Sequence, residues 1–426
     1  MGDGSAGPTV LESPEVAALL DELTTMVGRE DPYPRYARLR ELSAVVRAAD
    51  GALVVTRYDD CATVARDPRL GHPPADILAF AGFPDWAEHP ALRQLFTSML
   101  VLNPPEHTRL RRLVGRAFTA RRVRALRPAV ERMVDDLLVG LADEADIVGE
   151  FAFPLAAGVI GELLGVPAAD RGQFQGLVHD WSQVLEVITP DVLSRADPAA
   201  TRIREYLADL VAQRRRAPAD DLLSALAGAG TPGDATPDEE PDAPAGDRLD
   251  EEELLTMAAL LFAAGVETTT NLLANGLVAL SAHPAQLRLL RERPDLAAGA
   301  VEELLRFDGP VQLIGRVVME PIELGGCTVA EGERVVAYLG AGNRDPRRFA
   351  EPDQLRLDRA ESAPLSFGGG IHYCLGAPLA RLEAQVALPA LVRRFPELAL
   401  SGPPERRDSL TIRGFTRLPC APLAAG

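Results

Sequence analysis

One long apolar stretch between Asp250 and Ala282 limits most strongly what this chain can fold into. Asp250 and Glu253 have the spacing of a capping box, which predicts a helix start, and Pro284 sets the end of the helix near residue 282. A helix of about 33 residues is about 50 Å long, enough to cross a whole molecule of this size. Its middle is almost entirely apolar, so other elements must cover it on all sides. The sequence therefore predicts a fold built around this helix.

Further helical patterns and a few short β-rich runs surround this stretch. Helices are expected over 35–43, 59–65, 129–143, 151–164, 169–188, 198–214, 219–227, 285–292, 295–306 and 377–392. Strands are expected over 44–49 and 52–58, joined by an Asp-Gly turn, and over 316–324, 327–329 and 334–339. Glycines and prolines make the segment 68–100 irregular. The fold class is therefore mainly α with small β-sheets.

The chain reads as a single domain over residues 1–426. Residues 1–14 have the composition of a flexible tail, and residues 228–248 form a flexible acidic loop rich in proline and glycine. We interpret the second segment as a surface loop rather than a domain linker, because helix-rich sequence of the same kind resumes after it.

Charge and cysteine usage exclude several classes of protein. A net charge of -18 argues against nucleic acid as a partner. The four cysteines, Cys61, Cys327, Cys374 and Cys420, are far apart, which excludes a disulfide framework and a zinc pattern. The longest nearly apolar run, 254–266, is shorter than the ~20 residues of a membrane span. Without a secretory leader pattern, these features predict a soluble cytoplasmic protein with no membrane association.

Cys374 lies in the stretch 367–376, Phe-Gly-Gly-Gly-Ile-His-Tyr-Cys-Leu-Gly, directly before a helical pattern. Glycines allow a close approach of the backbone to a flat ligand, and the amide groups at a helix start favour a thiolate. A thiolate in such a loop suits axial ligation of a haem iron. Taken alone, a buried structural cysteine in a glycine-rich turn explains the same pattern.

Polar residues interrupt the long apolar helix at 264–270, Ala-Gly-Val-Glu-Thr-Thr-Thr. Glu267 and Thr268 form an acid–alcohol pair that could relay protons to a molecule bound over the helix, and an internally satisfied kink is the alternative. Glu303 and Arg306 have the spacing of an ordinary surface ion pair. His107 and Arg111 lie four apart on one expected helix face and can both donate to carboxylates.

Together these motifs resemble the cytochrome P-450 family. The stretch 367–376 resembles the haem-binding loop, 264–268 resembles the oxygen-activation motif, and Glu303-Leu-Leu-Arg306 matches the Glu-x-x-Arg signature. Residues 103–111 are similar to the propionate-binding helix of soluble bacterial members. The segment 343–359, with Arg359, resembles the one that precedes the haem loop. The order and spacing agree from about residue 30 to the C-terminus. A proline replaces the usual histidine before Leu365, which puts little in doubt.

The resemblance implies roles for individual residues around a haem b. Cys374 would be the iron ligand, and Thr268 with Glu267 would deliver protons to bound dioxygen. Glu303, Arg306 and Arg359 would form a buried network that supports the loop. The other implied cofactor contacts are His107, Arg111, Arg316, His372, Phe367, Gly368, Gly376, Ala264 and Gly265. The implied substrate-pocket residues are Leu260, Ala263, Gln312, Leu313, Ile314 and Phe415.

The implied reaction is insertion of one oxygen atom from O2 into a C–H or C=C bond of a largely apolar small molecule. By analogy with actinobacterial members, the substrate is a secondary-metabolite intermediate such as a polyketide, macrolide or peptide in antibiotic biosynthesis. No fused reductase is evident, so a separate ferredoxin and an NAD(P)H-dependent ferredoxin reductase would supply electrons to a monomer. Arg109, Arg112 and Arg116 are expected to dock the ferredoxin. A peroxide-dependent or non-oxygenating haem-thiolate enzyme and a haem-binding sensor without turnover remain alternatives.

Overall fold

The computed structural model describes residues 10–80, 82–142, 144–186, 188–228, 248–360, 362–394 and 399–421. The chain forms two compact units. Unit 1 comprises Met1–Pro73, Glu131–Phe153 and Thr268–Gly426, and unit 2 comprises Pro74–Val130 and Pro154–Glu267. Residues 1–9 of the expected tail and 229–247 of the expected loop lie outside the described residues. Leu11, which also fell within the expected tail, instead forms a parallel β-bridge with Val46.

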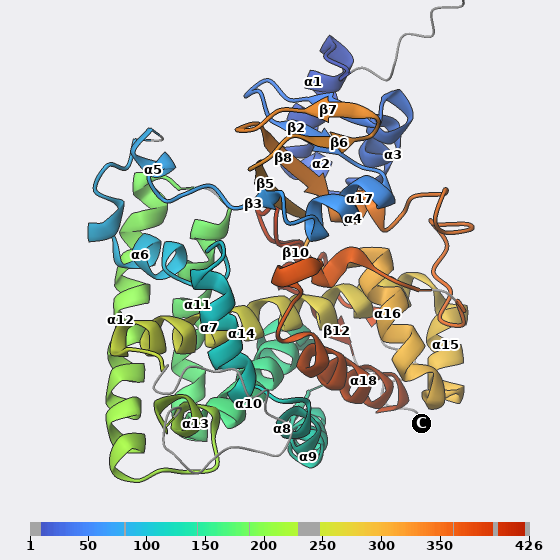
Figure 1. The fold of residues 1–426 in the computed structure, drawn as a ribbon. Helices are drawn as coiled ribbons and strands as arrows, with labels where there is room; N and C mark the ends of the chain where they lie inside the picture. The colour runs from blue at the N-terminus through green and yellow to red at the C-terminus, as the bar shows by residue number, and fades with distance from the viewer. Residues whose placement is uncertain are drawn as a thin grey trace, which may run out of the picture. The chain divides into compact units, whose positions relative to one another are not determined.

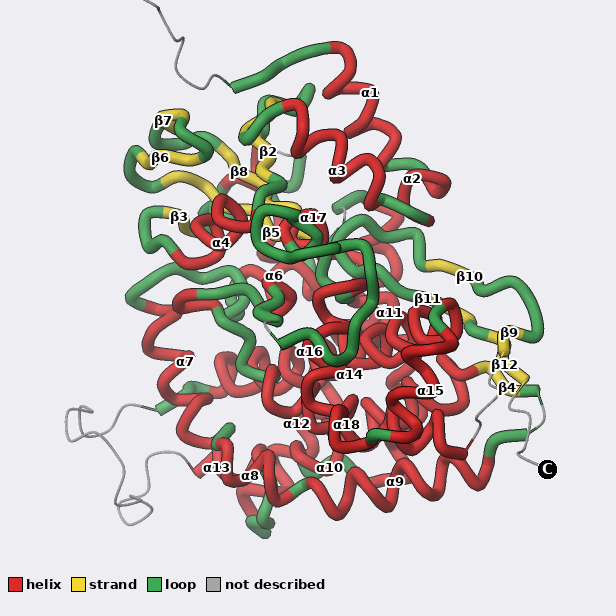
Figure 2. Tube along the Cα trace, turned by 90° about the vertical axis from the view of Figure 1, so that its right-hand side faces the viewer, coloured by secondary structure: helices red, strands yellow, loops and turns green. Residues whose placement is uncertain are grey.

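All of the described strands belong to unit 1, where they form four small sheets (Figures 1 and 2). The largest sheet has the order β1-β2-β8-β5-β3, and within it only β2 and β8 pair in parallel. Its strands are β1 (Val45–Arg47), β2 (Leu53–Val55), β8 (Arg334–Tyr338), β5 (Leu313–Val318) and β3 (Leu70–Gly71). The smaller sheets are β4 (Ala145–Asp146), β12 (Pro419–Ala421) and β9 (Ala399–Leu400), then β6 (Ile322–Leu324) with β7 (Cys327–Val329), and β10 (Glu405–Arg406) with β11 (Phe415–Arg417). The expected hairpin about Gly51 is confirmed.

Helices contain far more of the described residues than the short strands do, which confirms the mainly α fold. Those of unit 1 are α1 (Pro14–Leu23), α2 (Met26–Glu30), α3 (Tyr33–Leu42), α4 (Tyr58–Arg66), α15 (Pro284–Glu292), α16 (Ala297–Asp308), α17 (Leu339–Gly342) and α18 (Ala377–Arg394). Those of unit 2 are α5 (Ile77–Phe80), α6 (Pro90–Phe96), α7 (Glu106–Ala117), α8 (Ala120–Ala125), α11 (Phe174–Ser182), α12 (Pro190–Arg216) and α13 (Leu222–Gly228). Residues of both units contribute to α9 (Arg127–Gly140), α10 (Phe153–Leu164) and α14 (Glu251–Ala282).

The largest sheet buries both of its faces, because successive side chains of a strand point in opposite directions. Val45 and Val55 pack into one core with residues of α4, and Phe349 and Leu365 complete this core. Val46 and Val54 point the other way, into a second core that includes residues of α1 and α3. The sheet is therefore held between two apolar layers and provides a rigid base for the segments that follow β8.

The long apolar stretch is one continuous helix, α14, as expected. Its capping box is present: the Asp250 backbone N–H donates to Glu253 Oε2 (3.0 Å), and the Glu253 N–H donates to Asp250 Oδ1 (2.8 Å). By length and composition alone α14 could cross a membrane, but 83% of its apolar window is buried within the protein. The structure therefore assigns α14 to the protein core.

Helix α12 begins earlier than the sequence predicted, at Pro190 rather than near residue 198. The Thr189 hydroxyl accepts the Val192 N–H (3.2 Å), and Pro190 occupies the first turn, where a missing N–H costs nothing. Pro198 lies inside the helix. Proline is far more frequent in a first turn than in a helix interior, and Pro198 is an exception to this preference.

Candidate functional site

The loop that carries Cys374 is fixed by its own backbone, within unit 1. The Cys374 N–H donates to the Phe367 carbonyl (3.0 Å), and the Gly368 N–H donates to the Leu365 carbonyl (2.7 Å). Two short turns, η6 (Leu365–Phe367) and η7 (Gly370–His372), frame the loop. These backbone bonds close the loop on itself around the cysteine.

Two different structural features explain why this loop contains glycines. Gly368 and Gly370 have φ angles of 66° and 59°, in the left-handed region that favours glycine. At Gly369 an added Cβ would lie 2.4 Å from Arg66 Cγ, and at Gly370 it would lie 3.0 Å from the Arg66 backbone. We expected the glycines to let a flat ligand approach. At these two positions they let the end of α4 approach the loop.

Cys374 differs from the other cysteines in exposure. Cys61, Cys327 and Cys420 are buried, and Cys374 is half-buried. Burial raises the pKa of the Cys420 thiol to about 12 and also raises the pKa values of Cys61 and Cys327. Cys374 precedes α18 by three residues, and its carbonyl accepts the Ala377 N–H (3.3 Å). It is therefore the cysteine best placed to act as a thiolate ligand at a helix start.

A cluster around Arg381 of α18, which the sequence analysis did not predict, links this loop to α16. Arg381 donates to both carboxylate oxygens of Glu302 (2.5 and 3.0 Å) and to the Tyr373 hydroxyl (3.0 Å). Its guanidinium carbon lies 4.4 Å from the centre of the Phe367 ring, a cation–π distance. Arg381 therefore fixes the two aromatic side chains that flank the cysteine loop.

The structure brings Glu303, Arg306 and Arg359 together, with the first two fully buried. Arg306 donates to both oxygens of Glu303 (2.7 and 2.8 Å), and Arg359 Nε donates to Glu303 Oε2 (3.0 Å). The remaining Arg306 donors reach the carbonyls of Asn343 (3.0 Å) and Pro352 (2.7 Å). From spacing alone the pair resembled an exposed one, and its burial shows that it instead holds the chain segment before the cysteine loop.

Asn343 connects this ion-pair network to the cysteine loop. Its side-chain oxygen accepts the Leu365 N–H (2.7 Å), and its amide nitrogen donates to the Ser366 hydroxyl (3.0 Å). Ser366 in turn donates to the Leu305 carbonyl on α16 (2.6 Å). The buried network and the loop therefore form one hydrogen-bonded assembly.

Arg316 on β5 is a buried cation. No carboxylate among the described residues forms an ion pair with it. It is 8% exposed, and its Nη1 donates only to the neighbouring Gly315 carbonyl (2.7 Å). Burial lowers the pKa of Arg316 to about 10. Such a guanidinium indicates a place for an anion. In the same unit, the rings of His372 and His72 meet edge to face at 4.7 Å.

In unit 2, His107 and Arg111 lie on α7, one turn apart as expected. His107 is 1% exposed. Burial and then the charge of Arg111 lower the pKa of His107, so the imidazole is neutral near pH 7. A neutral ring can still donate one hydrogen bond, whereas Arg111 supplies the positive charge.

The oxygen-motif residues lie at the middle of α14. Most of this helix is buried, but Ala264 is exposed, and Gly265 and Thr268 are half-buried. These three positions lie on one face of α14. This face is therefore accessible over a short stretch at the motif. Glu267 is buried. An added Cβ at Gly265 would lie 3.1 Å from Ile160 of α10, so the close approach at this glycine is to a neighbouring helix.

The expected pocket residues differ in whether their side chains are free to contact a substrate. Leu260 and Ala263 are buried on α14, and Leu313 and Ile314 are half-buried on β5. The Gln312 side chain already has hydrogen-bond partners within unit 1. Its amide oxygen accepts from the Tyr36 hydroxyl (3.3 Å), and its amide nitrogen donates to the Gly309 carbonyl (2.7 Å).

Phe415 is also enclosed in unit 1. Its N–H donates to Asn271 Oδ1 (3.1 Å), and the Arg406 guanidinium carbon lies 4.3 Å from the centre of its ring. Leu313 and Ile314 are therefore better placed than Gln312 and Phe415 to contact a substrate.

These residues fit the requirements of a haem. Iron needs an accessible sulfur, and Cys374 provides it in a preformed loop. The two propionates need donors, and Arg316 is a buried guanidinium without a carboxylate partner in the described chain. A metal ion held by protein side chains alone is not indicated, since no group of three or more His, Cys, Asp or Glu side chains in the described residues could hold one.

The comparisons with known proteins agree with this chemistry. The sequence profile of the family named Cytochrome P450 matches residues 174–417. The vitamin D(3) 25-hydroxylase of Pseudonocardia autotrophica is 42% identical, over 92% of this chain and 93% of that protein. The 6-deoxyerythronolide B hydroxylase of Saccharopolyspora erythraea is 39% identical, over 91% and 95% of the two chains.

A solved structure also resembles this chain over most of its length. Mycobacterium smegmatis CYP164A2 superposes with a TM-score of 0.84 and 36% identity, over 95% of this chain and all of that one. Sequence profile, relatives and fold therefore agree with the cysteine loop and its supporting network. The chain belongs to the cytochrome P450 family and is a monooxygenase with a haem-iron cofactor.

Proposed function

We propose that residues 1–426 act as one catalytic domain that binds haem b and inserts one oxygen atom from O2 into a C–H or C=C bond. The observation that carries this proposal is the half-buried Cys374 just before α18, whose backbone N–H donates to the Phe367 carbonyl. The substrate is a bulky, largely apolar secondary-metabolite intermediate, a class supported by the name of the 6-deoxyerythronolide B hydroxylase.

The chain's own residues prepare the site for this chemistry. Haem iron with a thiolate ligand, when bound, activates dioxygen. Cys374 would hold the iron, and Arg316, His372, His107 and Arg111 would donate to the propionates. The Thr268 hydroxyl, at the accessible face of α14, and the buried Glu267 carboxyl beside it in the chain would hold and pass protons. Leu260, Ala263, Leu313 and Ile314 exclude water around the substrate.

Replacing the proposed ligand tests this function. In Cys374→Ser, the reduced protein with carbon monoxide is expected to lose the red-shifted absorption band of thiolate-bound haem, because a serine hydroxyl is a poor donor to iron. The wild-type protein and Cys420→Ser, which changes a buried cysteine, are expected to keep the band. A band that persists in Cys374→Ser would contradict the assignment.

The two alternative activities give different results with the wild-type protein. Turnover with peroxide but not with ferredoxin, its reductase and NAD(P)H would identify a peroxide-dependent enzyme. Reversible ligand binding without any product would identify a sensor. We favour oxygen insertion because the Glu267–Thr268 pair is intact.

We further propose that a separate ferredoxin docks on the arginine-rich surface of α7 and α8. Arg109 is already paired with Glu253, and Arg122 with Asp220 (3.3 Å). Arg116 is exposed, and Arg112 is half-buried one turn before it on α7. We assign docking chiefly to the exposed Arg116, together with Arg112 on the same helix.

Charge reversal tests this docking surface. We expect Arg112→Glu/Arg116→Glu to raise the KM for ferredoxin about tenfold or more at low salt, with less difference at high salt, because like charges then meet across the interface. Arg195→Glu, which reverses an exposed arginine on α12, serves as the matched control. An unchanged KM in the double variant would exclude this surface.

A further inference from the structure

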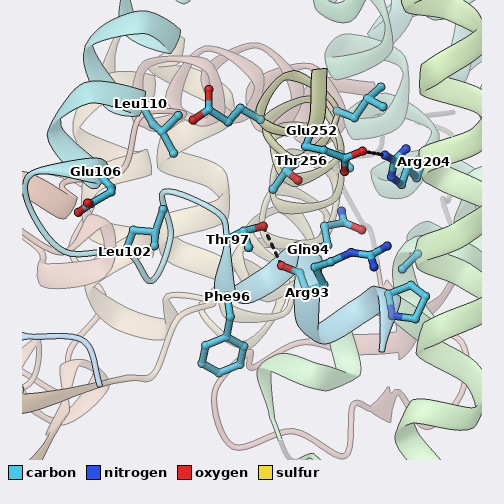
Figure 3. A pocket seen from close by; sticks show the side chains of 15 residues that line it. Arg93, Gln94, Phe96, Thr97, Leu102, Glu106, Leu110, Arg204, Glu252 and Thr256 are labelled. Carbon is cyan, nitrogen blue, oxygen red and sulfur yellow. Dashed lines mark hydrogen bonds and ion pairs between the residues drawn. The ribbon is translucent and has the colours of Figure 1, made fainter. Parts of the chain in front are cut away.

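Unit 2 contains a cavity of about 410 Å³ that the proposed function does not yet use (Figure 3). Side chains from four helices, α6, α7, α12 and α14, line it. Leu110, Ala200, Leu255 and Ala259 supply apolar wall. The volume is large enough for a substantial part of a small molecule rather than for a few water molecules.

The charged groups beside the cavity are largely neutralised by one another. Arg204 forms an ion pair with Glu252, as Figure 3 shows, and Arg109 forms one with Glu253. Glu253 also caps α14 by accepting the Asp250 N–H (3.0 Å). Arg93 and Glu106 also line the cavity and have no ion pair among the described residues, but their charges are opposite in sign. The lining therefore has little net charge with which to attract a cationic or an anionic ligand.

Gln94 of α6 is the unusual polar group of this cavity. It is 8% exposed, and its Nε2 has no hydrogen-bond partner among the described residues. Figure 3 shows its amide on the cavity side of α6, between Arg93 and the α14 residues Thr256 and Glu252. Buried amide donors are normally paired, so an unpaired one that lines a cavity indicates an acceptor on the molecule that fills it.

The wall formed by α14 leads from this cavity toward the oxygen motif. Thr256 and Ala259 line the cavity. Ala263 and Glu267 follow at intervals of four residues and share their helix face. Thr256 and Glu267 are about 16 Å apart along the helix axis. A molecule that reaches from Gln94 to the motif must therefore be bulky or elongated.

We propose that this cavity recognises a neutral oxygen-bearing group of the substrate, such as a ketone or lactone carbonyl, and that Gln94 is its specificity-determining hydrogen-bond donor. This inference rests on the proposed monooxygenase function. The opposite charges of the lining balance one another, which favours a neutral group over an ionic one. The apolar wall holds the carbon skeleton, and the amide fixes which end of the skeleton enters the cavity.

Matched ring compounds test the proposal with the haem-loaded protein. The probes are oxacyclohexadecan-2-one, a 16-membered lactone, and cyclohexadecane, which has the same ring size and no oxygen. Dissociation constants are measured from the change in the haem absorption band on titration. We expect Gln94→Leu to weaken lactone binding about three- to tenfold and to leave cyclohexadecane binding unchanged, because one neutral hydrogen bond is lost.

Two further variants separate hydrogen bonding from packing. Gln94→Glu keeps the shape but replaces the donor by an acceptor at neutral pH, and it is expected to weaken lactone binding at least as much. Arg195→Leu changes an exposed residue of α12 that is not among the residues lining the cavity, and it is expected to leave both constants unchanged. Equal weakening of both probes in Gln94→Leu, or no binding of the lactone by the wild-type protein, would overturn the proposal.

The carbon monoxide spectrum distinguishes this failure from failure of the proposed function. A wild-type protein with the thiolate band but no discrimination between the probes contradicts only the role of Gln94. A wild-type protein without the band contradicts the haem-thiolate function itself.

Discussion

Glu303→Leu is expected to lower the free energy of unfolding by about 3–5 kcal/mol, the usual cost of removing one partner from a buried ion pair. The side chains of Glu303 and Arg306 are both fully buried, and Arg306 would keep its charge without a counter-charge in direct contact. Arg359 would lose its bond to Glu303 as well. Urea unfolding followed by circular dichroism measures the change.

The loss should extend to the cysteine loop, because Arg306 donates to the Asn343 carbonyl and Asn343 holds Leu365 and Ser366. We therefore expect Glu303→Leu to lose haem faster than the wild-type protein. Arg195→Leu is the matched control, since it breaks an exposed helical pair with Asp191 (3.1 Å) and should cost less than about 1 kcal/mol.

A double variant separates two contributions to the loss of stability, the unpaired buried charge and the lost contact. Glu303→Leu/Arg306→Met removes both charges and should recover part of the stability that Glu303→Leu loses. If the single variant were as stable as the control, the network would not be the support that its burial indicates.

Glu383→Gln is expected to stabilise the protein at neutral pH. Glu383 on α18 is 1% exposed, and its Oε2 has no hydrogen-bond partner among the described residues. Burial raises the pKa of Glu383 well above its ordinary value of 4.5. The folded protein therefore keeps a proton that the unfolded chain releases, and folding becomes less favourable as the pH rises above that value.

The sign of this effect gives a specific pH profile. Between the ordinary pKa of 4.5 and the raised folded pKa, wild-type stability should fall relative to Glu383→Gln by about 1.4 kcal/mol per pH unit. Below pH 4.5 the difference in stability between the two proteins should become constant. Urea midpoints at pH 5, 6 and 7 measure it, and a difference that is independent of pH would contradict the buried-acid interpretation.

The sequence was sufficient for features that depend on local spacing. Asp250 and Glu253 predict a capping box, which forms because both partners lie within one helical turn. The apolar run after them predicts a buried helix. The cysteine loop is equally local, since its bonds join Phe367 to Cys374.

Long-range features could not be derived in this way. An exposed and a buried ion pair have the same i,i+3 spacing, so only the fold distinguishes Glu303–Arg306 from a surface pair. Arg381 and Glu302 are far apart in the sequence, and nothing local connects them. The helix expected over 198–214 missed residues 190–197 of α12, which follow the cap at Thr189.

The contact between α4 and the cysteine loop has a consequence for protein engineering. Glycines at 369 and 370 are required by the Arg66 side chain and backbone on a distant segment. A loop transplanted from another member of the family would carry its own residues at these positions but not its own residue 66. Chimeras should therefore exchange α4 and the cysteine loop together, as one interchangeable cassette.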